Sequence, residues 1–202
     1  QCRYGRIEQV VTAIKKLGFT DVVEVALGAD ITLYKESKEW EEKGLLTTSC
    51  CPSFVRFIEI NHPELKQYVS HTPSPMIEVA RLIKKSEPDA KVVFIGPCAA
   101  KKLEASRKKV RRDVDFVITF EELQALYDAA GIWLADLEVS KLDNASYFGR
   151  IFARSGGLTE ALKQGIKENN SDFELKSYTS YGVPYATSIN AIKPEFELPC
   201  AQ

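Results

Sequence analysis

Two continuous apolar runs of strand length constrain the fold of this chain more than any other feature. They are "AKVVFIGPC" (90–98) and "DVDFVITF" (113–120), and such unbroken apolar runs are typical of strands buried on both faces. Two further β-rich runs lie at 21–27 and 45–50. Helical patterns follow these strands at 30–43, 52–60 and 121–131. A strand followed by a helix, repeated about four times, indicates an α/β protein with a parallel sheet flanked by helices.

The helical patterns also suggest how the chain is organised. Further helices are predicted at 7–19, 73–87 and 153–169 from apolar residues at helical spacing. Asp30 is the expected N-cap of the helix over 30–43. The alternation weakens after about residue 132, so we expect a first α/β lobe over 1–135 and the start of a second lobe over 136–202. No element is predicted after residue 170, where glycine and proline interrupt the pattern.

Composition limits the class of protein. The chain has 202 residues, with 27 basic and 28 acidic side chains and a net charge of -1, which argues against nucleic acid as the main partner. The longest apolar runs are strand-sized, so no membrane span is expected. Residues 1–20 show no signal-peptide pattern. Five cysteines are an odd number and do not suggest a disulfide framework, so a cytoplasmic location is expected.

The cysteines stand where strands end. Cys50 and Cys51 lie between the β-rich run and the helix that follows it, and Cys98 directly follows an apolar strand. Ligands of open α/β sheets bind outside the carboxyl ends of the strands, and a helix N-terminus favours a thiolate or an anionic cluster. Lys101 adds a cation three residues after Cys98. The alternative is that these are buried structural cysteines, which is common for one such residue but less so for two motifs together.

Two motifs resemble those of a known family. "TSCCPSFVRFIEINHPEL" and "GPCAAKKLEA" are similar to the TSCCPxW and PCxxKxxE motifs of the catalytic domain of iron-only (di-iron) hydrogenases. "GADITL" (28–33) and "FARSGGLTEAL" (152–162) also resemble that family, in the right order. The resemblance covers roughly residues 6–165. It implies two lobes, with a 4Fe–4S cubane bridged to a di-iron unit between them, and reversible reduction of protons to hydrogen.

The resemblance also implies roles for single residues. It makes Cys51 and Cys98 metal ligands of the cubane, so their sulfurs are expected roughly 6–7 Å apart. It makes Cys50 the thiol that transfers protons, with Lys101 near a cyanide ligand of the di-iron unit. The family's proton path falls on three more residues, which are Glu36, Glu39 and Ser70. Without the resemblance, the two glutamates would be read as a solvated helix face.

Departures from the family pattern set limits on this prediction. The late CxxxC motif, which should supply the remaining cubane ligand and the bridging cysteine, is absent, and so are N-terminal ferredoxin-like cysteine clusters. We therefore expect a fragment of a longer protein or a degenerate member, which alone binds neither cluster and evolves no hydrogen. Phe54, Gly96 and Met76 replace a usual Trp, Met and Gln. Gly96 and Met76 are expected near the cofactor, and these changes suggest a divergent, sensory branch.

Partners and alternatives remain open on the sequence alone. A ferredoxin-type electron donor or attached Fe–S domains are the expected partners, and the basic run "RKKVRRD" (107–113) is an exposed loop that suits an acidic carrier. The main alternative is a non-catalytic module that senses hydrogen or binds a simple Fe–S cluster. A thiol enzyme using Cys50 is less favoured, because no histidine partner is identifiable. His62 and His71 lie nine residues apart in a loop-rich stretch, and "NHPEL" is interpreted as a helix-start turn rather than a metal site.

Overall fold

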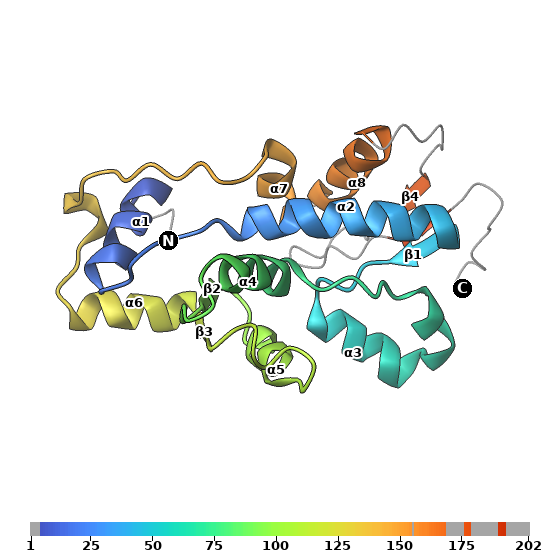
Figure 1. The fold of residues 1–202 in the computed structure, drawn as a ribbon, viewed down its shortest axis with the longest axis horizontal. Coiled ribbons are helices and arrows are strands. Elements are labelled where there is room, and N and C mark those ends of the chain that lie inside the picture. The colour runs from blue at the N-terminus through green and yellow to red at the C-terminus, as the bar shows by residue number, and fades with distance from the viewer. Residues whose placement is uncertain (1–4, 155, 169–175, 179–189, 193–202) are drawn as a thin grey trace. The chain divides into compact units, whose positions relative to one another are not determined.

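The computed structural model describes residues 5–154, 156–168, 176–178 and 190–192 (Figure 1). The elements, in chain order, are α1 (Ile7–Lys16), α2 (Val25–Lys43), β1 (Leu45–Thr47), α3 (Pro52–Asn61), the 3-10 helix η1 (Pro63–Tyr68), α4 (Pro75–Ser86), β2 (Val93–Gly96), α5 (Ala100–Ser106), β3 (Phe116–Thr119), α6 (Phe120–Ala129), η2 (Leu134–Asp136), α7 (Tyr147–Ile151), α8 (Gly157–Glu168), β4 (Lys176–Tyr178) and β5 (Asn190–Ile192). None of the described helices is both long and apolar enough to cross a membrane.

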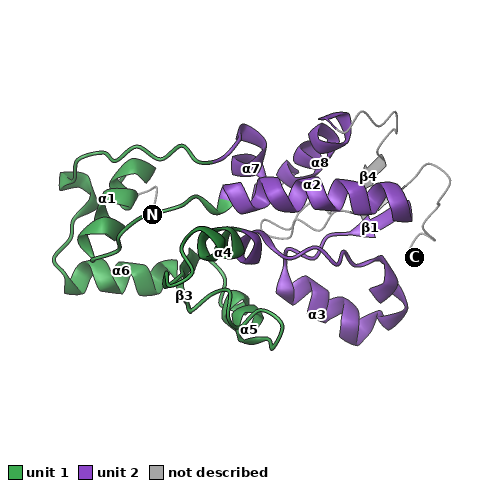
Figure 2. Cartoon of the chain, in the orientation of Figure 1, with its two compact units in different colours: residues 1–25, 79–144 green, residues 26–78, 145–202 purple. Residues whose placement is uncertain are grey.

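Contacts divide the chain into two compact units, each built from two segments (Figure 2). Unit 1 is Gln1–Val25 with Val79–Asn144, and unit 2 is Ala26–Glu78 with Ala145–Gln202. The division passes through α4. These units are defined by contacts alone, so the lobe boundary expected between residues 135 and 136 stays a prediction.

Unit 1 holds a two-stranded parallel sheet. β2 pairs in parallel with β3, with Val93 opposite Phe116 and Gly96 opposite Thr119. The α5 helix lies between the two strands in the chain, as a parallel connection requires. Thr119 then caps α6, since its side chain accepts a hydrogen bond from the Glu122 N–H in a capping box. The core of the unit includes Ala13, Ile14, Leu123, Tyr127 and Leu134.

Unit 2 is organised around the 19-residue helix α2. Ala29, Leu33 and the fully buried Trp40 face a core completed mainly by α8. Gly149 allows α7 to approach the start of α2, because a Cβ atom there would lie 2.4 Å from the Ala26 carbonyl oxygen. β1 pairs antiparallel with β5, which pairs antiparallel with β4.

The predicted α/β class is confirmed, but two local predictions are wrong. No strand forms at 21–27, where residues 21–24 lie outside any helix or strand and α2 begins at Val25. The β-branched valines favour a strand locally, but packing of one long helix against the core outweighs that preference. Asp30 lies inside α2 and not at its N-cap, and its carboxylate accepts hydrogen bonds from Ser146, at 2.9 Å from N and 2.5 Å from Oγ.

The predicted parallel sheet forms, and it is small. Within the described residues only β2 and β3 are parallel, and β1 pairs with later strands in antiparallel fashion. A run as short as β1, three residues long, carries too little periodicity to show the direction of its partner. The helices predicted at 7–19, 52–60, 73–87, 121–131 and 153–169 all form, with ends that differ by a few residues.

Candidate functional site

Three ionisable side chains of α2 line one side of the helix. Glu36, Glu39 and Lys43 are spaced three and four residues apart, so they share a face. Glu36 is fully buried, whereas the Glu39 side chain is 14% exposed and the Lys43 side chain 30% exposed. Burial therefore decreases along this face, from the enclosed Glu36 carboxyl to the Lys43 ammonium near solvent.

A short segment after η1 brings Ser70 to this face. Val69 forms a parallel bridge with Thr47 at the end of β1, and the Ser70 N–H donates to the Thr47 carbonyl at 2.8 Å. This backbone pairing holds the Ser70 hydroxyl 2.7 Å from Glu39 Oε2, to which it donates. The Thr72 N–H donates to Ser70 Oγ at 3.0 Å and fixes the oxygen from the other side. The three residues to which the family resemblance assigned a proton path thus share one region of unit 2.

Glu36 is suited to hold a proton near neutral pH. Burial raises its pKa to about 7, and its neighbour Glu39 adds to the rise. The Ser49 N–H, 3.4 Å from Oε1, and the Ser70 hydroxyl act in the opposite direction. Its buried Oε2 has no hydrogen-bond partner within the described part of the chain. An oxygen without a donor costs less free energy when the group is a neutral acid than when it is a carboxylate.

Glu39 has the opposite character. Partial burial raises its pKa, but hydrogen bonds from Lys43, Ser70 and His71 outweigh burial and bring the pKa to about 2. The Lys43 ammonium lies 2.6 Å from Oε1, and the Thr72 hydroxyl lies 3.3 Å from Oε2. Glu39 is therefore ionised at neutral pH. Two carboxyls of one helix face, both near the Ser70 hydroxyl, differ by about 5 in pKa, and this pairing separates a proton holder from a proton acceptor.

Sequence reasoning missed the outer end of this cluster. His71 Nδ1 lies 3.0 Å from Glu39 Oε1 and 2.9 Å from Lys43 Nζ, and the imidazole is 79% exposed. Lys43 follows Glu39 by four residues, a spacing that predicts an ion pair. No pattern in the sequence placed His71 against α2, because that contact depends on the pairing of residues 69–70 with β1.

The two adjacent cysteines have different surroundings. Cys51 is exposed and occupies the N-cap position of α3, with Pro52 as the first helical residue. Cys50 is half-buried and packs against the core of unit 2, and its Sγ lies 3.6 Å from Thr48 Oγ1. Neither takes part in a disulfide. One thiol is thus presented outward at a helix start, and the other packs between the Thr48 hydroxyl and the apolar core of unit 2.

The second cysteine motif lies in unit 1. Cys98 is exposed and falls between the end of β2 at Gly96 and the start of α5. The Lys101 ammonium donates to Glu104 at 2.6 Å, and both side chains are largely buried. Cys51 belongs to unit 2 and Cys98 to unit 1, so their expected spacing stays a prediction. Met76 is buried at the start of α4, and its expected role near a cofactor is likewise untested.

The donor groups fit an iron–sulfur cluster only in part. Exposed thiols at strand-to-helix turns, such as those of Cys51 and Cys98, are suitable iron ligands. Two thiolates do not complete the set of four that a cubane takes. Within the described ranges, no three His, Cys, Asp or Glu side chains come together as a metal site.

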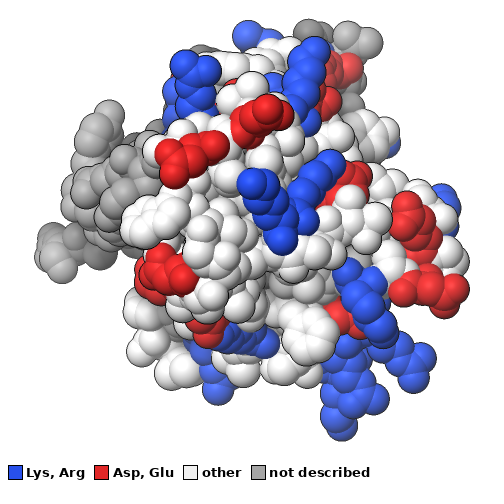
Figure 3. Space-filling model, turned by 90° about the vertical axis from the view of Figure 1, so that its left-hand side faces the viewer, with Lys and Arg blue, Asp and Glu red and all other residues white. Residues whose placement is uncertain are grey.

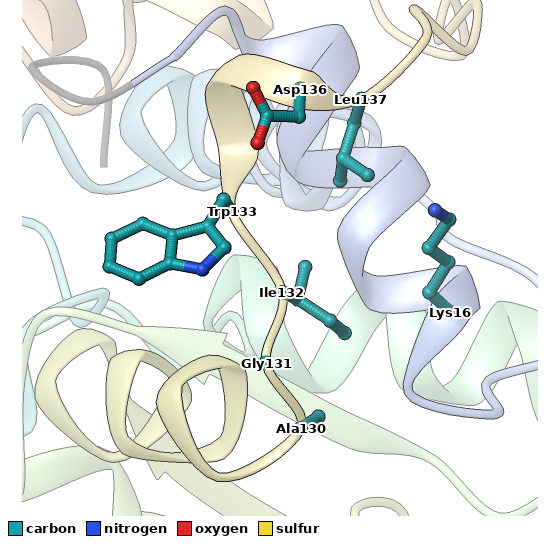
Figure 4. Close-up of a pocket in the computed structure, with 7 residues that line it drawn as sticks. All are labelled: Lys16, Ala130, Gly131, Ile132, Trp133, Asp136 and Leu137. Carbon is teal, nitrogen blue, oxygen red and sulfur yellow. The ribbon is translucent and has the colours of Figure 1, made fainter.

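A shallow pocket in unit 1 lies away from these residues in the sequence. Its volume is about 430 Å³, and it is bordered by Lys16 of α1 and by residues 130–133, 136 and 137. Figure 4 shows the Lys16 and Trp133 side chains on opposite sides of the connecting backbone. The pocket contains no cysteine or histidine, and its only charged side chains are those of Lys16 and Asp136. We assign it no part in the site.

Comparison with known proteins identifies the relationship. The family described as "Iron only hydrogenase large subunit, C-terminal domain" matches residues 5–195. Iron hydrogenase 1 of Clostridium pasteurianum is 35% identical over 190 residues, which cover 83% of this chain and 33% of that protein. The periplasmic Fe hydrogenase large subunit of Nitratidesulfovibrio vulgaris is 32% identical and covers 82% of this chain and 47% of its own.

A solved structure and a second kind of relative complete the comparison. A variant of FeFe-hydrogenase HydA1 from Chlamydomonas reinhardtii aligns with a TM-score of 0.70 and 26% identity, over 89% of this chain and 51% of that one. The cytosolic Fe-S cluster assembly factor NAR1 of Kluyveromyces lactis is 40% identical over 86 residues, which are 43% of this chain and 18% of that protein. The chain thus spans between a third and a half of the length of the two hydrogenases.

Proposed function

The chain belongs to the family of iron-only hydrogenase large subunits, and from that premise we propose that it is part of a catalytic domain. In the intact parent protein this domain reversibly reduces protons to hydrogen. The observation that carries the proposal is the arrangement of Glu36, Ser70 and Glu39 in unit 2. A buried acid of raised pKa, a hydroxyl and an ionised carboxylate in sequence are the parts of a proton relay.

The relay moves a proton without separating charge over a long distance. Glu36, when neutral, gives its proton to the Ser70 oxygen while the Ser70 hydroxyl proton passes to Glu39 Oε2, to which it already points at 2.7 Å. A serine hydroxyl has one donor and two acceptor positions, so it can accept from one carboxyl and donate to the other. The reverse sequence carries a proton inward from Glu39 to Glu36.

Glu39 does not retain a proton at neutral pH. Its pKa is lowered to about 2, whereas burial raises the pKa of Glu36 to about 7. A proton that reaches Glu39 is therefore passed on, so Glu39 acts as a transit group rather than as a resting site.

Cysteine roles follow from the difference in surroundings. We assign Cys51 and Cys98 to the cubane of the intact parent, since both are exposed thiols at helix starts. The half-buried Cys50 is the thiol that would hold and exchange a proton at the inner end of the relay, and Lys101 would offer a cation to an anionic cofactor. The iron cofactor, when bound, would supply the site at which protons and electrons from the donor combine to form hydrogen. The remaining cluster ligands come from outside the described residues.

Electron supply involves a separate partner or an attached Fe–S domain. The basic segment 107–112 after α5 carries five exposed cations, which are Arg107, Lys108, Lys109, Arg111 and Arg112. Within the described part of the chain, no carboxylate forms an ion pair with any of them. Figure 3 shows Lys and Arg side chains on one face of the molecule, with Asp and Glu side chains among them. This charge suits an acidic ferredoxin-type donor, and reversing it at Lys108 and Lys109 should raise the donor's KM.

Location stays a proposal as well. A cytoplasmic protein agrees with three described cysteines that form no disulfide and with the cytosolic relative NAR1. The relative from Nitratidesulfovibrio vulgaris is described as periplasmic, so fractionation of the native cells decides between the two compartments.

The experiment that tests the proposed function uses the intact parent, matured with its iron cofactor. Cys50→Ala should leave the iron content nearly unchanged and reduce hydrogen turnover by at least about 100-fold, because proton delivery is lost. Cys51→Ala should lose iron, because a cubane ligand is removed. Full turnover in Cys50→Ala, or full iron content in Cys51→Ala, would contradict the assignment of the two thiols.

A second candidate function is a non-catalytic Fe–S or hydrogen-sensing module. The similarity to NAR1 and the replacements at Phe54, Met76 and Gly96 favour it. An added Cβ at Gly96 would lie 2.5 Å from the Phe94 ring, so this position could not take the family's usual methionine without a shift of that ring. A parent that binds iron and lacks hydrogen turnover under reducing conditions would establish the second function.

A further inference from the structure

We propose that His71 is the group through which protons enter the Glu36–Ser70–Glu39 relay from solvent. Lys43 is the cation that stabilises the neutral imidazole after each proton transfer. This inference rests on the proposed function of the relay, and it adds a residue that lies outside the three positions assigned from the sequence. His71 is the titratable residue at the outer end of the cluster, and its side chain is 79% exposed.

Backbone contacts fix His71 against the relay. The His71 N–H donates to both oxygens of Glu39, at 3.0 Å and 3.1 Å. The ring then lies with Nδ1 3.0 Å from Glu39 Oε1, on the carboxylate oxygen opposite the one that Ser70 contacts. Glu39 therefore joins the imidazole on one oxygen to the hydroxyl on the other, and the path from solvent to Ser70 is continuous.

Nδ1 of His71 can be used in two exclusive ways. It lies 3.0 Å from the acceptor Glu39 Oε1 and 2.9 Å from the donor Lys43 Nζ. When Nδ1 carries a hydrogen, it donates to Glu39, and the Lys43 ammonium bonds Glu39 at 2.6 Å instead. When Nδ1 has a free lone pair, it accepts from Lys43. The two arrangements differ by one proton at the atom that faces Glu39.

This geometry allows a balanced proton step. A solvent proton binds the lone pair of the exposed Nε2 while Nδ1 carries its hydrogen, which gives the imidazolium ion. The Nδ1–H bond then breaks, its proton forms a bond to Glu39 Oε1, and the ring is left neutral with hydrogen on Nε2. Lys43 donates to the vacated lone pair of Nδ1 and stabilises that state. Exchange of the ring hydrogens with solvent restores the first arrangement, as the two nitrogens of imidazole permit.

Neighbouring groups are less suited to this step. The charged groups that contact the ring from α2 are Glu39 and Lys43, and a lysine ammonium holds its proton at neutral pH. The Thr72 hydroxyl contacts Glu39 at 3.3 Å but is largely buried. Imidazole is the side chain whose charge ordinarily changes between about pH 5 and 8. His62, the other histidine of the chain, instead lies 3.5 Å from Glu64.

The test follows protonation of Glu36 in the 202-residue chain by time-resolved infrared spectroscopy after photolysis of a caged proton. The Glu36 carboxyl band is identified as the band that Glu36→Gln removes. His71→Gln keeps the backbone N–H bonds to Glu39 and should slow protonation of Glu36 by about tenfold or more, with its equilibrium midpoint unchanged. His62→Gln is the matched control and should keep the wild-type rate. In His71→Ala, added imidazole should restore the rate.

The outcomes separate this proposal from the relay itself. An unchanged rate in His71→Gln, with a slow rate in Ser70→Ala, would keep the relay and overturn the role of His71. Unchanged rates in both variants would overturn the relay and the proposal together. A shifted Glu36 midpoint with no rescue of His71→Ala by imidazole would show a structural role for His71 and would also overturn the proposal.

Discussion

Replacing Glu36 by glutamine should remove most of the pH dependence of stability near neutrality. The pKa of Glu36 is raised by burial from its ordinary value of 4.5 to about 7. The folded protein therefore binds more protons than the unfolded chain between these values, and its stability falls as pH rises. The contribution is fully present below pH 4.5 and is lost as pH rises through 7. Between pH 5 and pH 8 the loss amounts to about 2 to 3 kcal/mol.

The assay is urea denaturation at pH 5 and pH 8, with the free energy of unfolding compared between variants. From pH 5 to pH 8, the free energy of unfolding of wild type should fall by about 2 to 3 kcal/mol more than that of Glu36→Gln. The neutral amide occupies the buried site at every pH, so its own cost is independent of pH. Glu42→Gln, which changes an exposed residue of α2, is the matched control and should follow wild type. Parallel pH profiles for wild type and Glu36→Gln would refute the reasoning.

Three more outcomes are expected from denaturation measurements. Glu39→Gln should lower the free energy of unfolding by about 1 to 3 kcal/mol at pH 7. The difference from wild type should shrink as pH falls from 4.5 toward 2, because the pKa of Glu39 is lowered to about 2. Equal stability of the two proteins at pH 7 would contradict this prediction. Trp40→Ala should cost about 3 to 5 kcal/mol, because Trp40 is fully buried, whereas Trp133→Ala, at 73% exposure, should change stability by less than about 0.5 kcal/mol. Gly157→Ala should lower the free energy of unfolding by about 3 kcal/mol or more, because its Cβ would lie 1.7 Å from the Ile151 carbonyl oxygen. Gly165→Ala, whose Cβ would have its nearest contact 3.4 Å away, should leave stability unchanged or raise it by up to about 1 kcal/mol.

Local sequence patterns correctly predicted the buried strands. The apolar runs ending at Gly96 and Thr119 form the parallel pair β2 and β3, because strands buried on both faces lack polar alternation. The valines at 22–25 misled the prediction, since they follow strand preference but lead into α2. That helix is stabilised by its contacts with α8, which lies more than a hundred residues later and leaves no signal at 21–27.

In the candidate site too, local spacing predicts some features, whereas others depend on residues that are distant in the sequence. Glu36 and Glu39 share a helix face that spacing alone predicts. Their difference in pKa was not predictable, because it depends on the burial of Glu36 and, for Glu39, on hydrogen bonds from Ser70 and His71 in addition to the one from Lys43. Ser70 and His71 reach α2 through the pairing of Val69 with Thr47. His71 was assigned only to a loop-rich stretch for the same reason. Side chains supplied by a loop are assigned from the sequence only when the pairing of that loop is known.

The measurement that tests the central claim most directly is hydrogen turnover of the intact parent carrying Ser70→Ala. The Ser70 hydroxyl donates to Glu39 at 2.7 Å and lies near Glu36, so its removal interrupts the relay and leaves the cysteines in place. We expect iron content equal to wild type and turnover reduced by at least about 100-fold, in the range of lost general acid–base catalysis. Ser74→Ala, which removes another buried hydroxyl, should keep turnover. Turnover of Ser70→Ala within twofold of wild type would contradict the account.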